Sequence, residues 1–205
     1  MTSFRTDKIE HGYLPRYVRL LGEIMHHPIA EKVGIVELGV RDGASMEMWA
    51  TLAPDAIVIG VDNSDHAVTN VPGTHFIRAN QEDSDLPYRI NAALKNIWKG
   101  DPISENWEPS YMNGTVDLLV DDASHDGEKT RQAFDNLWQL VGSGGYYVIE
   151  DWYVGFDGWP DYDRSMLDFA EGILGYLQQK ALESDMQIDS IEYRYGMILI
   201  RRAWE

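Results

Sequence analysis

Short runs of consecutive apolar residues alternate along this chain with longer segments in which apolar residues recur every three or four positions. The short runs predict buried strands at residues 34–38, 57–61, 74–78, 116–120 and 146–149. The longer segments predict amphipathic helices at residues 17–25, 45–52, 88–98, 130–141 and 166–177. Residues 188–202 predict two further strands, joined as an antiparallel hairpin around Arg194-Tyr195-Gly196.

Strands that alternate with helices predict an α/β fold in which helices cover both faces of a mostly parallel sheet. Seven strands are expected, and the C-terminal hairpin supplies the antiparallel part. The glycine-rich residues 142–145 are expected to end a helix before the fifth strand, and residues 100–113 read as a loop. No repeat or linker divides the chain, so we expect one domain over residues 1–205, with residues 1–30 as an N-terminal helical or lid segment.

Composition narrows the class of protein. The chain has 44% hydrophobic and 25% charged residues, which is typical of a globular domain, and it has no cysteine for disulfide or thiol chemistry. Its formal net charge of −17 would repel nucleic acid and anionic membranes, so neither is expected as a partner. No apolar run reaches membrane-spanning length and the first residues do not resemble a secretory signal, which favours a cytoplasmic protein.

Ligands of such sheets bind at the carboxyl ends of the strands, and an acidic or amide side chain follows each parallel strand here. The turn at residues 37–43 has glycines at Gly39 and Gly43, but Arg41 stands where a pyrophosphate-binding turn needs a third glycine. A nicotinamide-dependent dehydrogenase is therefore disfavoured. Asp62 can accept both hydroxyls of a ribose, and Glu37 suits a cation, so these residues fit S-adenosylmethionine better than NAD.

Two apolar strands run directly into acidic residues, the first into Asp121 and Asp122 and the second into Glu150 and Asp151. If these strands are neighbours, three carboxylates crowd together, and their mutual repulsion calls for a cation among them. Oxygen ligands favour Mg²⁺, with Mn²⁺ or Ca²⁺ as alternatives. His125 could be a further ligand or a general base. His26, His27 and His66 lack such neighbours and are interpreted as surface residues.

These motifs resemble the metal-dependent sugar O-methyltransferases of macrolide and rhamnosyl tailoring, which have the class I methyltransferase, Rossmann-like fold. The resemblance is carried by residues 121–125 and 144–151, by the turn after the first strand, and by the N-terminal Thr6-Asp7-Lys8, His11-Gly12-Tyr13 and Tyr17. It implies that Asp122, Glu150 and Asp151 bind Mg²⁺ and that His125 is the general base. It also implies an S-adenosylmethionine site formed by Glu37, Gly39, Gly43, Asp62, Gln81, Asp83 and Asp121.

We therefore expect an enzyme that methylates a hydroxyl of a sugar or similar small molecule in natural-product biosynthesis. Trp152, Tyr153, Phe156 and Trp159 either line the acceptor pocket or form a hydrophobic plug over the end of the sheet. The aromatic loops and the resemblance also favour a homo-oligomer. The alternatives are a tailoring enzyme similar to cephalosporin hydroxylases and a non-catalytic domain that binds S-adenosylmethionine.

Overall fold

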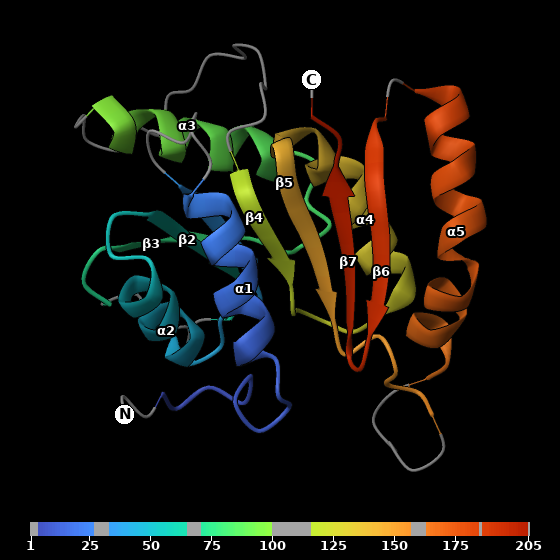
Figure 1. Cartoon of the computed structure of the whole chain (residues 1–205), viewed down its shortest axis with the longest axis horizontal. Coiled ribbons are helices and arrows are strands. Elements are labelled where there is room, and N and C mark those ends of the chain that lie inside the picture. The colour runs from blue at the N-terminus through green and yellow to red at the C-terminus, as the bar shows by residue number, and fades with distance from the viewer. Residues whose placement is uncertain are drawn as a thin grey trace.

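The computed structural model describes residues 4–26, 33–64, 71–99, 116–156, 163–184 and 186–204 (Figure 1). The helices in these ranges are α1 (Leu14–Met25), α2 (Ala44–Leu52), α3 (Leu86–Lys99), α4 (Gly127–Leu137) and α5 (Ser165–Glu183), with a 3-10 turn at Trp138–Leu140. The strands are β1 (Gly34–Leu38), β2 (Ile57–Asp62), β3 (Thr74–Arg78), β4 (Val116–Asp121), β5 (Val141–Glu150), β6 (Ile188–Arg194) and β7 (Met197–Arg202).

The strands form one sheet in the order β3-β2-β1-β4-β5-β7-β6. Strands β1 to β5 pair in parallel, whereas β7 pairs antiparallel with both β5 and β6. The predicted α/β class and the predicted hairpin are therefore confirmed. Among the residues that the structure describes, no helix combines the length and the apolar character needed to cross a bilayer.

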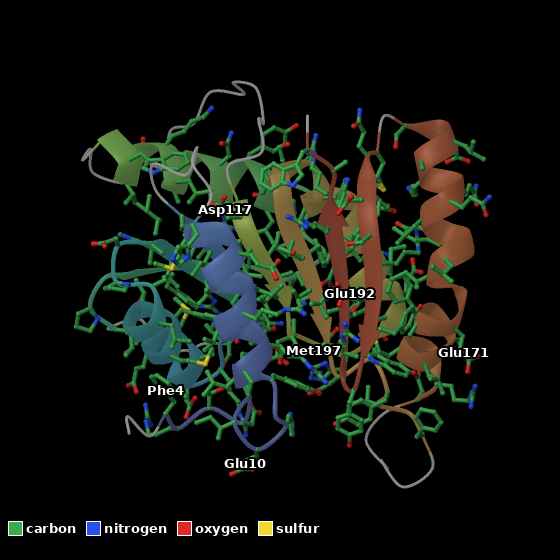
Figure 2. All side chains as sticks on the ribbon, viewed as in Figure 1. Phe4, Glu10, Asp117, Glu171, Glu192 and Met197 are labelled. Atoms are coloured by element: carbon green, nitrogen blue, oxygen red, sulfur yellow. The ribbon has the colours of Figure 1, made fainter. Side chains whose placement is uncertain are left out.

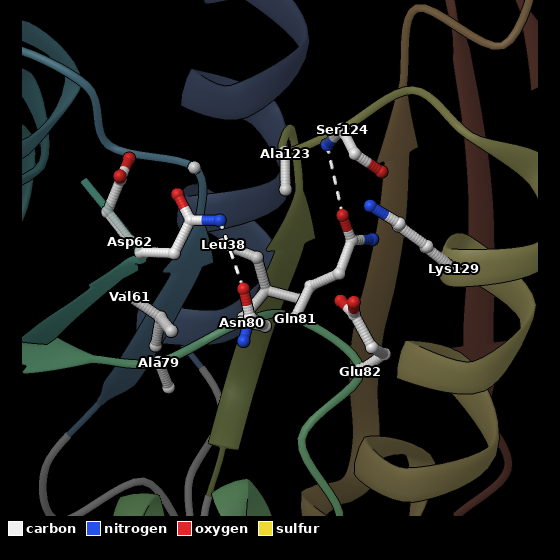
Figure 3. A pocket seen from close by; sticks show the side chains of 12 residues that line it. Leu38, Val61, Asp62, Ala79, Asn80, Gln81, Glu82, Ala123, Ser124 and Lys129 are labelled. Carbon is white, nitrogen blue, oxygen red and sulfur yellow. Dashed lines mark hydrogen bonds between the residues drawn. The ribbon is translucent and has the colours of Figure 1, made fainter.

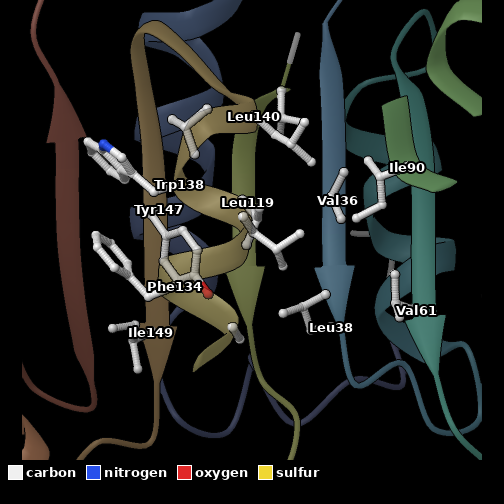
Figure 4. Close-up of a cluster of buried hydrophobic side chains, with 14 of the residues drawn as sticks. Val36, Leu38, Val61, Ile90, Leu119, Phe134, Trp138, Leu140, Tyr147 and Ile149 are labelled. Atoms are coloured by element: carbon white, nitrogen blue, oxygen red, sulfur yellow. The ribbon is translucent and has the colours of Figure 1, made fainter. Parts of the chain in front are cut away.

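Helices cover both faces of the sheet, as the sequence predicted. On one face α1 and α2 pack over residues such as Ile35, Val58 and Val120. On the other face α3, α4 and α5 pack over a larger cluster, in which Phe134 lies against Tyr147 and Leu119 is buried at the centre (Figure 4). This burial on both sides explains why the parallel strands read as continuous apolar runs.

The sequence prediction for residues 142–145 is wrong. These glycine-rich residues belong to β5, whereas they were expected to end a helix before that strand. Close packing explains the glycines. A Cβ atom on Gly144, which has φ +73°, would lie 2.1 Å from the Trp204 ring, and one on Gly145 would lie 3.0 Å from the carbonyl oxygen of Asp117. The helix that was predicted to reach residue 141 accordingly ends at Leu137, and the 3-10 turn follows it.

The N-terminal segment before α1 lies at the edge of the sheet toward which β4 and β5 run (Figure 1). Figure 2 labels Glu10, an exposed residue of this N-terminal segment. Pro15 lies in the first turn of α1, where a missing N–H costs nothing, and the helix then buries Tyr17, Leu20 and Leu21 against the sheet. The segment is thereby fixed beside the carboxyl ends of the strands, where the candidate site lies.

Candidate functional site

The sheet register brings the predicted acidic residues together. Asp121 pairs with Leu38 of β1 on one side and with Ile149 of β5 on the other. The next residues therefore lie at the same level on neighbouring strands, with Asp122 directly after β4 and Glu150 at the end of β5. The prediction that these strand ends are adjacent is confirmed.

Among the described residues of the loops after the central strands, three non-glycine residues have a positive φ. They are Arg41 at +47°, His125 at +51° and Asp151 at +52°. Side chains other than glycine rarely adopt this conformation, and it is concentrated at functional sites, where the surrounding structure holds it in place. Two of these three residues, His125 and Asp151, are ones for which the sequence predicted chemistry.

Asp122, His125 and Asp151 form a compact group. Nε2 of His125 lies 3.8 Å from Oδ1 of Asp122 and 4.0 Å from Oδ2 of Asp151. One ligand atom from each of the three residues lies within 4.8 Å of the other two, and all three side chains are partly exposed. Two carboxylates and an imidazole that open toward solvent in this way can hold a divalent cation and leave coordination positions for a substrate.

Glu150 lies apart from this group because its carboxylate points into the protein. Its Oε2 accepts a 2.9 Å hydrogen bond from Nζ of Lys8, and its Oε1 accepts one from the hydroxyl of Tyr17. Burial, followed by the charge of Asp122, raises the pKa of Glu150 well above its usual range. Metal ligation by Glu150 stays a prediction, and it would require this side chain to share or exchange a partner.

Lys8 supplies a cation that the sequence reasoning did not assign. Its Nζ, fully buried, lies 2.6 Å from Oδ2 of Asp122, 2.9 Å from Oε2 of Glu150 and 3.0 Å from Oε1 of Glu37. Burial alone would lower the pKa of Lys8, but the three carboxylates outweigh burial and raise that pKa well above its usual value. Two of the three carboxylates that were expected to need a cation, those of Asp122 and Glu150, thus receive one from the chain itself.

Other residues of the N-terminal segment also reach the strand ends. The hydroxyl of Tyr13 donates a hydrogen bond to Oδ1 of Asp151, and Nδ1 of His11 lies 3.8 Å from the same oxygen. The signal for these contacts was present in the sequence, in the motif Thr6-Asp7-Lys8, His11-Gly12-Tyr13 and Tyr17. The sequence could not show which side chains they contact, because residues 122 and 151 lie far away along the chain.

A small cavity of about 140 Å³ opens beside the ends of β2 and β3 (Figure 3). Gln81 crosses it: Oε1 of Gln81 accepts a 3.0 Å hydrogen bond from the backbone N–H of Ser124, and Nε2 donates to the carboxylate of Asp121 at 3.2 Å. On the other side of the cavity Asn63 donates to Asn80 at 3.0 Å. These amides and backbone groups offer neutral donors and acceptors suited to a heterocycle or a hydroxyl group.

Asp121 supports this cavity from below. It is buried, and burial followed by the nearby charge of Asp122 raises its pKa to about 7. Asp121 and Gln81 together fix the amide plane that faces the cavity. Asp121 acts behind the wall of the cavity, so its predicted contact with a cofactor stays a prediction.

A larger cavity of about 550 Å³ adjoins the small one, and the two share Gly39, Asp62 and Ala123 in their walls. Its volume lies within the range of roughly 300–1,000 Å³ that is typical of small-molecule sites. Asp122 and His125 line it, as do Arg5 and Arg41. A ligand could therefore extend from the amide-lined cavity to the Asp122–His125 side.

Gly39 and Asp62 shape the junction between the cavities. Gly39 has φ +85°, and a Cβ atom there would lie 2.1 Å from the carbonyl oxygen of Asp122, so only glycine fits. The carboxylate of Asp62 accepts 2.8 Å hydrogen bonds from the backbone N–H groups of Arg41 and Ser64. These bonds orient the carboxylate at the edge of both cavities.

The remaining predicted cofactor residues, Glu37, Gly43 and Asp83, are not among the residues that line these two cavities. Glu37 is fully buried and accepts a 2.8 Å hydrogen bond from Nε1 of Trp49. Gly43, with φ +77°, begins α2, and Asp83 closes its own loop by accepting from the backbone N–H of Asn80 at 3.0 Å. Their structural roles are clear, and their contact with a cofactor stays a prediction.

The structure describes part of the aromatic loop that follows β5. Trp152 packs edge-on against Tyr153 and Tyr193, while Tyr153 stacks on Tyr195 with ring centroids 5.4 Å apart. Phe156 is exposed, and Trp159 lies outside the described residues. His26 is exposed, whereas His27 and His66 also fall outside the described residues.

Comparison with known proteins connects this geometry to a family. A family model described as "Methyltransferase domain" matches residues 36–152, which is more than half of the chain. The chain is 24% identical over 186 residues to 8-demethyl-8-(2-methoxy-alpha-L-rhamnosyl)-tetracenomycin-C 3'-O-methyltransferase of Streptomyces olivaceus, covering 87% of this chain and 41% of that protein. It is 25% identical over 189 residues to mycinamicin VI 2''-O-methyltransferase of Micromonospora griseorubida, covering 85% and 42%. The chain thus spans about two-fifths of the length of these curated relatives.

Solved structures agree on the fold. The MycE methyltransferase from the mycinamycin biosynthetic pathway, in complex with Mg, SAH and mycinamycin VI, superposes with a TM-score of 0.68 at 20% identity, over 96% of this chain and 53% of that chain. Another crystal form of MycE, with Mg and SAH, gives a TM-score of 0.66 at 22% identity, over 94% and 50%. The chain therefore belongs to the methyltransferase-domain family and is distantly related to macrolide and rhamnosyl sugar O-methyltransferases.

Proposed function

We propose that the chain is an S-adenosylmethionine- and Mg²⁺-dependent O-methyltransferase that acts on a hydroxyl of a sugar or a similar small molecule. The observation that carries this proposal is the junction of the two cavities, with Asp122 and His125 lining the larger one. The names of the relatives, which are O-methyltransferases of rhamnosyl and other deoxysugar groups, support the choice of acceptor.

In this proposal the methyl donor lies across both cavities. Its adenine would occupy the small cavity against Gln81 and the backbone of Ser124, and its ribose hydroxyls would bind the carboxylate of Asp62. The absence of a side chain on Gly39 leaves room for the donor to continue into the larger cavity. The sulfonium would then approach the acidic side of the site, where negative charge stabilises it.

The donor set fits a divalent cation. Asp122 and Asp151 present oxygen ligands, with one oxygen of each within 4.8 Å of the other and of a ring nitrogen of His125, which stays unligated as the proposed base. When bound, such a cation would lower the pKa of an acceptor hydroxyl and orient its oxygen. We assign Asp122 and Asp151 as ligands, and Glu150 as a predicted third ligand that is engaged by Lys8 and Tyr17.

His125 is the proposed general base. Its Nε2 would accept the proton of the acceptor hydroxyl as the new C–O bond forms and the methyl–sulfur bond of the donor breaks, which releases S-adenosylhomocysteine. The carboxylates of Asp122 and Asp151, 3.8 and 4.0 Å away, would stabilise the imidazolium that results.

The test combines binding and turnover in the purified chain. Calorimetry should detect S-adenosylhomocysteine binding after chelation of divalent ions. Release of S-adenosylhomocysteine from S-adenosylmethionine, measured across a panel of rhamnosides and other glycosides with vicinal hydroxyls, should require added Mg²⁺. Turnover that persists in the presence of a chelator would contradict the metal, and a lack of S-adenosylhomocysteine binding would contradict the methyl donor.

The alternative proposal is an iron-dependent tailoring enzyme, because two histidines lie near the carboxylate of Asp151. His11 and His125 both lie beside Asp151, but His11 contacts the opposite oxygen and is not part of the described Asp122–His125–Asp151 group. Iron oxygenases need two histidines and a carboxylate on one face of the metal. Copurification of iron instead of magnesium would favour this alternative.

A further inference from the structure

The N-terminal segment contributes a buried ammonium group to the end of the sheet. Nζ of Lys8 has three N–H groups, and three carboxylate oxygens lie within 3.0 Å of it, one each from Glu37, Asp122 and Glu150. These residues belong to β1, to the loop after β4 and to β5. One side chain therefore joins the three central parallel strands at the edge where the cavities open.

The two oxygens of Asp122 face different surroundings. Oδ2 accepts the 2.6 Å hydrogen bond from Lys8, whereas Oδ1 lies on the side of His125, 3.8 Å from Nε2. The hydrogen bond from Lys8 therefore distinguishes the two oxygens and leaves Oδ1 on the side of His125. This bond fixes the orientation of the Asp122 carboxylate, because Lys8 is itself held by Glu37 and Glu150.

We propose that Lys8 is a positioning residue of the methyl-transfer site, which orients Asp122 so that Oδ1 faces the cation position beside His125 and Asp151. This inference rests on the proposed function, because a cation must bind there for the orientation to matter. Lys8 does not itself touch the acceptor or the methyl donor in this scheme. Groups that orient metal ligands in this way typically contribute 10- to 100-fold to metal affinity.

Charge and orientation predict opposite results when Lys8 is removed, which makes the inference testable. Lys8→Met leaves the site with one more net negative charge, and electrostatic attraction alone would then tighten the binding of a divalent cation. Loss of the fixed Asp122 orientation would weaken that binding instead. The sign of the change therefore separates a positioning role from simple charge balance.

The experiment measures Mn²⁺ affinity of the full chain by electron paramagnetic resonance, with neither methyl donor nor acceptor present. We expect Lys8→Met to weaken Mn²⁺ binding at least tenfold and to change the affinity for S-adenosylhomocysteine, measured without metal, less than threefold. Lys180→Met is the matched control, because Lys180 forms a 2.9 Å ion pair with Asp135 on the partly exposed surface of α5. It should leave both affinities unchanged.

A second variant keeps the test valid if Lys8→Met does not fold. Lys8→Met combined with Glu37→Gln removes a positive and a negative charge together, so the net charge of the cluster stays that of the natural chain. We expect this double variant to fold, as judged by its melting transition, and to bind Mn²⁺ at least tenfold more weakly than Glu37→Gln alone. Unchanged or tighter Mn²⁺ binding in either Lys8 variant would overturn the positioning role.

The outcome for the natural chain distinguishes the two proposals. If it binds Mn²⁺ and the Lys8 variants bind equally well, only the inference about Lys8 is wrong. If the natural chain does not bind Mn²⁺ at all, the metal of the proposed function is wrong, and the role of Lys8 falls with it.

Discussion

The cavity beside β2 and β3 and the acidic ends of β4 and β5 lie along the same edge of one sheet but are built by different means. The first is lined by the amides of Asn63, Asn80 and Gln81 together with Asp62, Glu82 and Lys129. Its amide hydrogen bonds join loops that directly follow strands, as between Asn63 and Asn80. The second concentrates charge and takes partners from the N-terminal segment, 114 residues away in the case of Lys8 and Asp122.

The difference indicates how each region tolerates change. A site of neutral hydrogen bonds loses roughly 0.5–1.5 kcal/mol per bond when one is removed. A buried charge network loses much more when a single partner is removed, because the remaining charges stay buried without compensation. We therefore expect substitutions on the amide-lined side to have graded effects on binding, and those on the charged side to have large effects on chemistry or folding.

The largest expected effect would separate chemistry from donor binding. His125→Ala should lower kcat about 10²- to 10⁴-fold, because the proposed general base is lost, while the affinity for S-adenosylhomocysteine stays within about twofold. Turnover with a glycoside acceptor and calorimetry with S-adenosylhomocysteine provide the two values. His26→Ala, at an exposed histidine at the end of α1, is the matched control. A parallel loss of binding would show that the two regions are not separable.

The next prediction tests the junction between the regions. Gly39→Ala should destabilise the chain by about 3–5 kcal/mol, because its Cβ would lie 2.1 Å from the carbonyl oxygen of Asp122 and because φ is +85°. Gly172→Ala in α5 meets open space and should stabilise the helix by roughly 0.5–1 kcal/mol. Urea unfolding measures both. If Gly39→Ala unfolds with the same free energy as the natural chain, the backbone at position 39 can shift to accommodate a Cβ atom.

A pH series would test the carboxyl group between the two regions. The unfolded chain loses the Asp121 proton near the usual pKa of 3.8, whereas the folded chain keeps it until about pH 7. This group therefore makes the natural chain progressively less stable as pH rises from about 4 to 7. Asp121→Asn should remove that loss.

The stability difference between Asp121→Asn and the natural chain should grow by roughly 2–4 kcal/mol in favour of the variant across this window and level off above pH 7. Urea unfolding at pH 4, 5, 6, 7 and 8 gives the curve. A difference that is independent of pH would show that Asp121 ionises normally.

The smallest effect belongs to the amide-lined cavity. Gln81→Ala removes the bonds to Ser124 and Asp121 and should weaken S-adenosylhomocysteine binding about 3- to 10-fold, while Mn²⁺ affinity stays unchanged. Gln139→Ala, at an exposed glutamine in the 3-10 turn, serves as the control in the same calorimetric titration. A loss of S-adenosylhomocysteine affinity above 100-fold would contradict the graded effects expected for the amide-lined cavity.

Most of the fold was predictable because both faces of the sheet are buried. The buried strand at 34–38 matched the structure at both ends, and so did the more polar and less buried strand at 74–78. The start of β5 was misjudged, because glycines at positions 142–145 usually break structure. Here they allow Trp204 and the carbonyl oxygen of Asp117 to approach the strand closely.

The site was predictable where each residue follows a strand directly. Asp122, His125 and Asp151 gather as expected, because parallel strands bring their carboxyl ends to one edge. The direction in which each side chain points was not predictable. Glu150 and Asp151 are neighbours in sequence, yet one faces Lys8 inside the protein and the other faces His125 near the surface.

The sequence by itself determined the order of strands and helices, the acidic residues at the strand ends and the need for a positive charge among them, because these follow from local patterns and elementary electrostatics. Only the tertiary structure decided where a positive charge comes from within the chain. The N-terminal segment folds under the sheet edge and buries Lys8 among Glu37, Asp122 and Glu150, a meeting of distant segments that no local pattern encodes.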